Sequence, residues 1–197
     1  MLRKTPKFSR IFFVVYVVVA LVLLALPKNI LPGFYNIPVM ATLALVSAFI
    51  IILPRLIFKP KQKVQERGVA KMQNVLTLSL LINGAGGLGL YKLYQYGFEY
   101  DKLMHYATPL ILTLGFIYFF RNYSNWPLKK ALWRTSFLVF AGGIFWEILE
   151  WTSDRLLDTS FVLGGGGIGW RDTIFDVIAN ILGILTAVIY LHYKSRK

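Results

Sequence analysis

The sequence contains no cysteine and few acidic residues: its 197 residues include 9 aspartates and glutamates against 22 lysines and arginines. The absence of cysteine excludes a disulfide framework, a thiol nucleophile and a cysteine-ligated zinc or iron–sulfur site. Charged residues of both signs make up only 16% of the chain, whereas 56% of the residues are hydrophobic. This composition is much more apolar than that of a soluble globular protein of similar size, and it argues against a water-soluble enzyme.

Long apolar runs with few charges occur six times along the chain. A membrane-spanning helix needs about 20 mostly apolar residues, and backbone polar groups in lipid must be satisfied within their own helix. The sequence therefore predicts an all-α, polytopic transmembrane helical bundle of six spans, forming a single membrane domain over residues 1–197. The predicted spans are approximately residues 11–30, 37–54, 75–94, 103–120, 131–151 and 174–193. The first has no clear cleavage site, which favours a retained helix over a signal peptide.

Basic residues are distributed unevenly between the two predicted sides of the membrane. Tails and loops on one side carry 17 lysines and arginines, and loops on the other side carry 5. Basic loops stay in the cytoplasm, so both termini are predicted to be cytoplasmic. The same loops explain the net charge of +13 without nucleic acid, because they would lie against anionic membrane lipids.

Acidic residues show the opposite asymmetry. Of the nine, only Glu66 lies on the predicted cytoplasmic side, and the other eight belong to the outer face or the outer part of the bilayer. Three of the predicted spans carry polar residues at helical spacing, so each presents a polar stripe on one face. These stripes consist of Asp101 and His105, of Glu147, Glu150, Asp154 and Asp158, and of Asp172, Asp176 and Asn180.

The three polar stripes are expected to meet inside the bundle. A carboxylate in hydrocarbon costs about 3 kcal/mol on insertion scales unless it faces the protein interior and finds a partner. We therefore expect His105, Glu147 and Asp176 to share a polar pocket just beneath the external surface. Carboxylates brought together repel, and the usual remedies are protonation, an arginine partner or a bound cation. Carboxylates with one imidazole suit a divalent ion such as Mg²⁺, Mn²⁺, Ca²⁺ or Zn²⁺.

Simpler roles for the same residues stay open. The polar side chains could form interhelical hydrogen bonds that only fix the bundle, with Arg155 or Arg171 as counter-ions. Asp101 and Asp172 could be favourable acids at helix N-termini, where the helix dipole attracts negative charge. The glycines at 164–167 predict a flexible outer loop, either a lid over the acidic site or a linker.

Three stretches, residues 101–105, 146–151 and 170–183, together resemble the VanZ-like membrane proteins and a related group of bacterial inner-membrane proteins of the YjdF type. The resemblance covers about residues 97 to 190. Members show an aspartate and a histidine four residues apart, a glutamate on the next helix and a D-x-x-x-D-x-x-x-N-like run on the last. The matching residues are Asp101, His105, Glu147, Asp172, Asp176 and Asn180. Glu150 followed by Trp151 is closer to the YjdF-type group. The resemblance implies a multi-pass protein of the bacterial cytoplasmic (inner) membrane with a role in the cell envelope.

The leading hypothesis is a cell-envelope membrane protein whose acidic and histidine site binds or acts on a lipid or a lipid-linked envelope precursor, with a divalent metal ion as the candidate cofactor. In the enzymatic form, His105 and Glu147 would be the catalytic acid and base. The candidate metal ligands are Asp101, Asp172 and Asp176. The candidate substrate-binding residues are Glu150, Arg155, Arg171 and Asn180.

The alternative hypothesis is a non-catalytic protein, either a scaffold for envelope enzymes or an ion- or proton-coupled carrier. A carrier needs polar groups through the inner half of the bundle. The sequence offers few there beyond Thr108, Thr113 and Ser136, which counts against transport. The residues alone leave both an enzyme and a non-catalytic protein open.

Overall fold

The computed structural model describes residues 4–27, 36–157 and 170–195, and all the regular secondary structure in this part of the chain is helical. Five of the helices are long and apolar enough to cross a membrane, and α3 with the 3-10 helix η2 forms a pair bent by 52° that would count as a sixth span. This confirms the predicted all-α membrane bundle. The elements are α1 (Lys7–Ala25), α2 (Ile37–Ile57), α3 (Lys63–Gly87), η2 (Leu90–Tyr96), α4 (Tyr100–Tyr123), α5 (Leu128–Leu157) and α6 (Trp170–Lys194).

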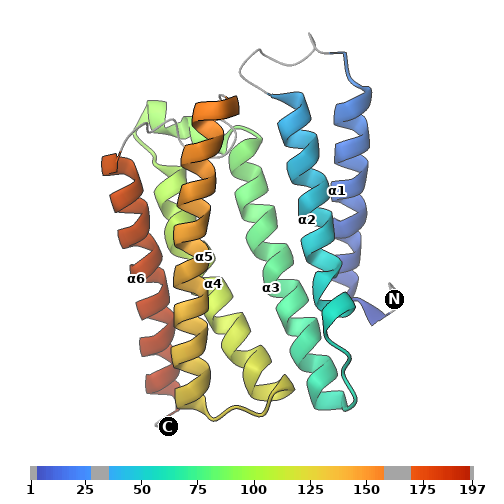
Figure 1. Cartoon of the computed structure of the whole chain (residues 1–197), viewed down its shortest axis with the longest axis vertical. Coiled ribbons are helices and arrows are strands. Elements are labelled where there is room, and N and C mark those ends of the chain that lie inside the picture. The colour runs from blue at the N-terminus through green and yellow to red at the C-terminus, as the bar shows by residue number, and fades with distance from the viewer. Residues whose placement is uncertain (1–3, 28–35, 158–169, 196–197) are drawn as a thin grey trace.

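The helices run up and down along one axis, and the described chain begins and ends at the same end of the bundle (Figure 1). We call this the terminal end, and we call the opposite end, where α4 and α6 begin, the site end. Helix α3 packs between the α1–α2 pair and α4, while α5 contacts α4 and α6. Because α4 and α6 are separated by one returning helix, they run in the same direction and both start at the site end.

The observed helices extend most of the predicted spans at one or both ends. The largest difference is α3, which begins at Lys63 rather than near residue 75. Its first turns carry charged residues and therefore do not belong to an apolar run. A capping box formed by Gln62 and Gln65 nevertheless starts the helix there. Helix α1 ends at Ala25, and the rest of its predicted span reaches into residues 28–35, which lie outside the described residues.

Two glycines allow α4 to approach its neighbours closely. A β-carbon added at Gly183 of α6 would collide with the backbone carbonyl oxygen of Tyr106 on α4. A β-carbon at Gly115 of α4 would collide with the side chain of Val75 on α3. Small residues at such positions let membrane helices pack through dispersion contacts at short range. The backbones of α4 and α6 therefore touch one turn below the site described in the next section.

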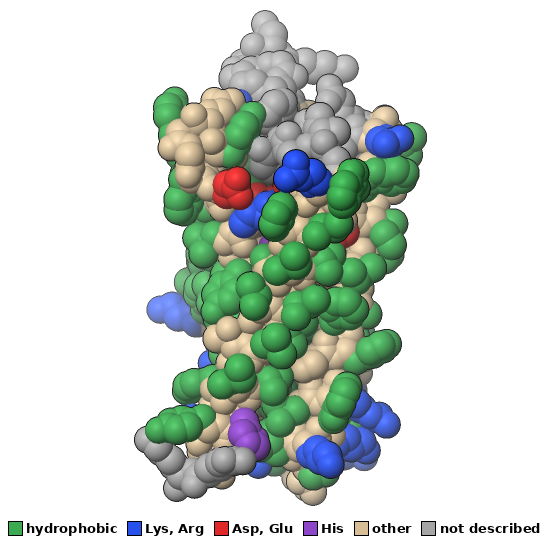
Figure 2. Space-filling view, turned by 90° about the vertical axis from the view of Figure 1, so that its left-hand side faces the viewer, with side chains coloured by type: hydrophobic (Ala, Val, Ile, Leu, Met, Phe, Trp, Pro, Cys, Tyr) green, Lys and Arg blue, Asp and Glu red, His purple; other side chains and the backbone are tan. Residues whose placement is uncertain are grey.

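Large hydrophobic side chains point away from the bundle along its middle. On α5, Phe137 and Phe145 are 72% and 61% exposed, and Leu182 on α6 is 51% exposed. Figure 2 shows hydrophobic side chains over the middle of one face, basic side chains at the terminal end, and acidic and basic side chains together near the site end. An apolar belt of this kind fits contact with lipid acyl chains and not with water.

A buried group of charged and polar side chains ties α2 to α3 at the terminal end. The guanidinium of Arg55 donates from Nε to Gln73 Oε1 at 2.9 Å, from Nη1 to Glu66 Oε2 at 2.8 Å and from Nη2 to the carbonyl of Lys4 at 2.7 Å. Gln73 Nε2 in turn donates to the carbonyl of Ile51 at 3.0 Å. We call these residues the Arg55 cluster. Each of its buried donors has an acceptor, so it joins three segments of chain.

The half of the bundle near the terminal end is more polar than expected. Ser9 Oγ donates to Asn74 Oδ1 at 3.0 Å, and Thr77 Oγ1 bonds Ser9 Oγ at 2.9 Å. The prediction that this half holds few polar groups is therefore wrong. These bonds face α1, whereas Asn83 on α3 bonds Thr108 on α4 at 2.8 Å. The two polar groups of α3 thus lie on different faces of the helix.

Candidate functional site

The first turns of α4 place an acid and an imidazole side by side, as their spacing predicts. Asp101 and His105 are four residues apart, and His105 Nε2 lies 3.5 Å from Asp101 Oδ1. Both side chains are only 7% exposed. Asp101 lies in the first turn of the helix and His105 in the second, so they are buried but close to the level where the bundle ends.

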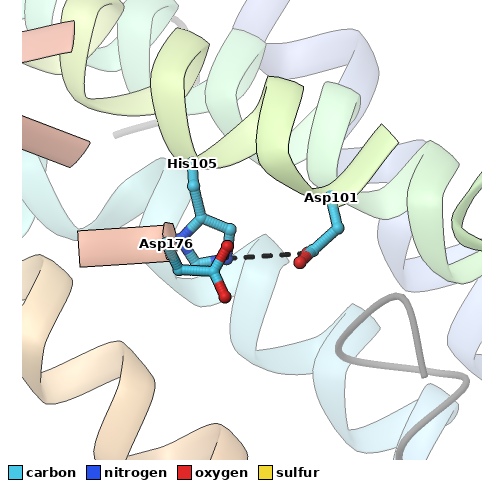
Figure 3. Close-up of side chains that lie close together, drawn as sticks. All are labelled: Asp101, His105 and Asp176. Carbon is cyan, nitrogen blue, oxygen red and sulfur yellow. Dashed lines mark ion pairs between the residues drawn. The ribbon is translucent and has the colours of Figure 1, made fainter. Parts of the chain in front are cut away.

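Helix α6 brings a second acid and an amide to the same imidazole. Asp176 Oδ1 lies 3.9 Å from His105 Nε2, and Figure 3 shows its carboxylate facing the ring from the opposite helix, with Asp101 beside it. Asn180 Nδ2 lies 3.4 Å from the other ring nitrogen, His105 Nδ1. The close contact of α4 with α6 at Gly183 sets this register, because it fixes the two helices one turn below the site.

Helix α5 completes the surroundings of the imidazole. Glu147 Oε1 lies 3.1 Å from His105 Nδ1, and the Glu147 side chain is buried. The expectation that His105, Glu147 and Asp176 converge from three helices is therefore confirmed. Their roles as acid, base and ligands remain predictions. With the neighbouring residues described below, we call this group the His105 cluster; it comprises Asp101, Lys102, His105, Glu147, Glu150, Asp172, Asp176 and Asn180.

The two nitrogens of His105 face different kinds of neighbour. Nε2 faces the carboxylates of Asp101 and Asp176, whereas Nδ1 faces Glu147 and the amide of Asn180. An imidazole that binds a metal through one nitrogen commonly donates the proton on its other nitrogen to a carboxylate. The surroundings of His105 fit this pattern. Nε2 faces the two carboxylates that could bind an ion together with it, and Nδ1 faces the Glu147 carboxylate, which could accept its proton.

Lys102 is a member of the cluster that the sequence analysis did not identify. Its ammonium bonds Asp172, lies 2.7 Å from Asp176 Oδ1 and lies 3.4 Å from Asp101 Oδ2. The side chains of Lys102 and Asp172 are 23% and 26% exposed, against 7% or less for Asp101, His105, Glu147 and Asp176. Lys102 and Asp172 therefore form the outer layer around these four residues. Asp172, a predicted metal ligand, is thus held by a lysine outside the buried group of Asp101, His105 and Asp176.

The two arginines predicted to contact substrate, or to act as counter-ions, lie elsewhere. Arg155 and Arg171 are both exposed, and within the described ranges neither forms an ion pair with an acid of the His105 cluster. The guanidinium carbon of Arg155 lies 4.4 Å from the centroid of the Trp151 ring. The counter-ion for these acids is therefore Lys102.

Several oxygens of the cluster are buried without a hydrogen bond. Among the residues that the structure describes, none donates a hydrogen bond to Asp101 Oδ1, Glu147 Oε1 or Glu150 Oε2. The His105 nitrogens lie 3.5 and 3.1 Å from the first two oxygens, and a hydrogen bond there requires the ring proton to be on the facing nitrogen and directed at the oxygen. A buried acceptor without a donor costs about 1–3 kcal/mol, and more if it is charged. These oxygens therefore favour a ligand that carries positive charge or donates protons.

The buried group has a suitable donor set for a metal ion. Asp101, His105 and Asp176 can each offer one ligand atom, and these atoms lie within 4.8 Å of one another. Two ligands about 2.1 Å from a tetrahedral ion lie about 3.4 Å apart. The separations of His105 Nε2 from Asp101 Oδ1 and Asp176 Oδ1, 3.5 and 3.9 Å, are close to this value. One imidazole and two carboxylates suit Zn²⁺ or Mn²⁺.

Other predicted features lie outside the described residues. These are Asp158, the glycines at 164–167 that were interpreted as a lid or a linker, and the side chain of Asp154. Within the described part of the chain, the polar stripe of α5 consists of Glu147 and Glu150.

Comparison with known proteins places the chain among membrane proteins. Residues 8–197 match the family described as "Predicted membrane protein (DUF2238)". An uncharacterised protein of Thermotoga maritima is 25% identical over 123 residues, which is 61% of this chain and 62% of the relative. The alignment thus spans less than two thirds of that protein. No solved structure matches the chain significantly.

Proposed function

Because this chain belongs to the DUF2238 family of membrane proteins, we propose a function for its buried aspartate and histidine residues as part of a multi-pass membrane protein. In this proposal the site end carries a divalent-metal centre that acts on the headgroup of a lipid or of a lipid-linked precursor in the bacterial cell envelope. The motifs shared with VanZ-like and YjdF-type proteins support the envelope role, and the geometry of the cluster supports the metal.

The observation that carries the proposal is the division of partners around His105. Nε2 faces the carboxylates of Asp101 and Asp176 at tetrahedral ligand spacing, while Nδ1 faces Glu147 at 3.1 Å. Simple packing of polar groups would be served by one partner for each nitrogen. Here two buried acids face the same nitrogen, and a cation between them would remove their mutual repulsion.

The proposal assigns different tasks to the glutamates of α5. Glu147 would accept the Nδ1 proton of His105 and so hold the imidazole with Nε2 directed at the ion. Glu150, whose buried Oε2 has no donor among the described residues, would act as the general base that takes a proton from a reacting water or hydroxyl. A bound divalent ion would supply Lewis-acid polarisation of a headgroup oxygen.

The position of the cluster supports a headgroup as substrate. His105 is five residues from Tyr100, where α4 begins, which is about 8 Å along the helix. Lipid phosphates and sugars lie at this level, at the edge of the hydrocarbon. The charge asymmetry of the loops assigns the site end to the outer leaflet in this proposal.

The test is metal analysis of the purified full chain in detergent. Wild-type protein loaded with Zn²⁺ or Mn²⁺ and then desalted should retain a stoichiometric ion, and Asp176→Asn should lose it. Glu147→Gln should weaken binding about 10- to 100-fold, because it removes the group that orients His105. Glu66→Gln is the matched control, since it removes an acid of the Arg55 cluster at the other end.

Metal content that is equally negligible in all four proteins would contradict the proposal and favour a non-catalytic scaffold held by polar packing. Far-UV circular dichroism of each variant establishes that the helices are intact. If the metal is bound, activity on lipid-linked phosphates in reconstituted vesicles should require Glu150, and Glu150→Gln should abolish it while the ion stays bound.

A further inference from the structure

The proposed metal centre already contains a cation of its own. Lys102 places its ammonium 2.7 Å from Asp176 Oδ1 and 3.4 Å from Asp101 Oδ2, and these are carboxylates of two candidate metal ligands. The ammonium also bonds Asp172 at the outer edge of the cluster. The three acids thus form ion pairs with one and the same lysine.

We infer that Lys102 is a built-in competitor of the metal ion: its ammonium and the ion bind Asp176 alternately, so that Lys102 sets the affinity of the site and is released when the ion binds. This inference rests on the proposed metal centre. It assigns a role to a residue that neither the motif resemblance nor the donor set of the centre includes.

The competition arises because the same oxygen, Asp176 Oδ1, would have to bind both the ammonium of Lys102 and the metal ion. Asp176 Oδ1 accepts the bond from Lys102 Nζ, and the same oxygen faces His105 Nε2 at 3.9 Å, where a ligated ion would have to lie. Two positive charges this close together repel strongly in the reduced dielectric of a protein, and a divalent ion repels an ammonium more strongly than a monovalent ion does. The ammonium and the ion would therefore not share this oxygen at close range.

The ammonium of Lys102 has a second acidic partner, Asp172, that it can keep when it leaves Asp176. Asp172 lies beside it in the outer layer, and both side chains are partly exposed, in contrast to Asp176, whose side chain is 3% exposed. A lysine has a flexible four-carbon stem and three rotatable donors. Its ammonium can therefore leave Asp176 and keep Asp172, so release does not strand a buried charge.

The lysine also leaves part of the cluster uncompensated. Asp101 Oδ1 and Glu147 Oε1 accept no hydrogen bond from the described residues, and the contacts of Lys102 are to Asp101 Oδ2, Asp172 and Asp176. The ammonium of Lys102 thus neutralises the outer layer of the cluster more than the buried carboxylates. An ion bound by Asp101, His105 and Asp176 would neutralise the interior, which gives it an advantage over the lysine.

The first experiment measures Mn²⁺ affinity by electron paramagnetic resonance of free Mn²⁺, on full chains in uncharged detergent. Lys102→Met should bind Mn²⁺ at least about tenfold more tightly than wild type, because it removes a positive charge next to a ligand. Lys102→Arg keeps that charge and should stay within about threefold of wild type. Lys92→Met, in η2 at the same end of the bundle, controls for the general loss of one positive charge.

The second experiment needs no variant of Lys102 and so remains informative if Lys102→Met does not fold. Wild-type protein is treated briefly with a small acylating reagent, with and without Mn²⁺, and modification of Lys102 and Lys92 is quantified by peptide mass spectrometry. Mn²⁺ should increase acylation of Lys102, because its ammonium leaves Asp176, and should not change that of Lys92. Asp176→Asn should abolish the Mn²⁺-dependent change.

The outcomes separate this inference from the proposed function. If wild type binds Mn²⁺ but Lys102→Met binds it equally or more weakly, and acylation does not change, the competition is refuted and the metal centre stands. If no protein binds Mn²⁺, including Lys102→Met, both the metal centre and the competition are refuted. If Lys92→Met tightens binding as much as Lys102→Met, the effect is general electrostatics and the specific competition is refuted.

Discussion

The Arg55 cluster and the His105 cluster hold buried charges at opposite ends of the same bundle, but they balance these charges differently. In the Arg55 cluster one guanidinium meets one carboxylate, one amide and one backbone carbonyl at 2.7–2.9 Å. In the His105 cluster four carboxyl groups face one lysine and one histidine, and three buried oxygens, one of them on Glu150, accept no hydrogen bond from the described residues.

The difference separates a polar group that serves the fold from one that is suited to a ligand. A buried charge that is fully paired holds helices together, and removing one of its partners lowers the free energy of unfolding. A buried carboxylate without a donor destabilises the chain by itself and is retained where something else binds it. Four substitutions test this distinction.

Replacing Arg55 should have the largest effect on stability. Arg55→Met leaves Gln73 Oε1 and the Lys4 carbonyl without their donor in a buried place, so the free energy of unfolding should fall by about 3 kcal/mol. Sodium dodecyl sulfate titration in mixed micelles, followed by far-UV circular dichroism, measures this change. Metal affinity of the folded protein should not change. A coupled loss of metal binding would show that the two clusters are not independent.

Replacing Gly183 should affect both stability and the site. In Gly183→Ala the new β-carbon meets the backbone of Tyr106, which cannot rotate away, so α4 and α6 must separate. We expect a loss of about 2 kcal/mol in the same titration and a weaker Mn²⁺ affinity, because Asp176 moves away from His105. Gly142→Ala is the matched control, since a β-carbon there has no neighbour within 4 Å. Equal behaviour of the two variants would show that the α4–α6 contact does not position the site.

Neutralising an acid of the His105 cluster should stabilise the fold, opposite in sign to Arg55→Met. Glu150→Gln replaces a carboxyl group beside other carboxylates with an uncharged amide and keeps the shape of the side chain. The free energy of unfolding should rise by about 1 kcal/mol, as is common when a functional site is neutralised. The same titration measures this change. A loss comparable with that of Arg55→Met would mean that Glu150 is a structural partner.

Glu66→Gln should have the smallest effect. The Glu66 side chain is 38% exposed, and an ion pair in contact with water contributes only about 0–1 kcal/mol. Glutamine also keeps an acceptor oxygen for Arg55. A melting temperature close to that of wild type is therefore expected, whereas a large decrease would show that the carboxylate itself, and not the guanidinium, holds the Arg55 cluster together.

The membrane fold could be predicted from the sequence because hydropathy and span length decide it. The spans at residues 37–54 and 103–120 lie within α2 and α4, and only their ends differ from the observed helices. The start of α3 at Lys63 was missed because charged turns outside the hydrocarbon carry no hydropathy signal, although they continue the helix. The wrong expectation of few polar groups in this half has another cause: Thr77 is a polar residue within an apolar run, and Ser9 lies beside Arg10, outside the predicted first span.

The convergence of the site residues could also be predicted from the sequence. An acid within the membrane must face a partner in the protein interior, and three helices carry polar stripes at similar depth. Lys102 was missed because its partners Asp172 and Asp176 are about 70 positions away in the chain, and a lysine near a span boundary was counted only as a loop charge. A signal did exist: Lys102 is three residues from His105 and thus near the same helix face. The Arg55 cluster likewise joins residues on different helices.

The packing of α5 has a mechanical consequence for the site. Helix α5 contacts α4 and α6 and otherwise presents large side chains such as Phe145 and Ile148 outward, so it is attached to the bundle on one side. Asp101, His105 and Asp176 belong to α4 and α6, which touch at Gly183, whereas Glu147 and Glu150 move with α5. A sideways displacement of α5 would open a lateral entrance for a headgroup that diffuses in the bilayer. The three proposed ligands of the ion would remain together while the two glutamates moved away from it.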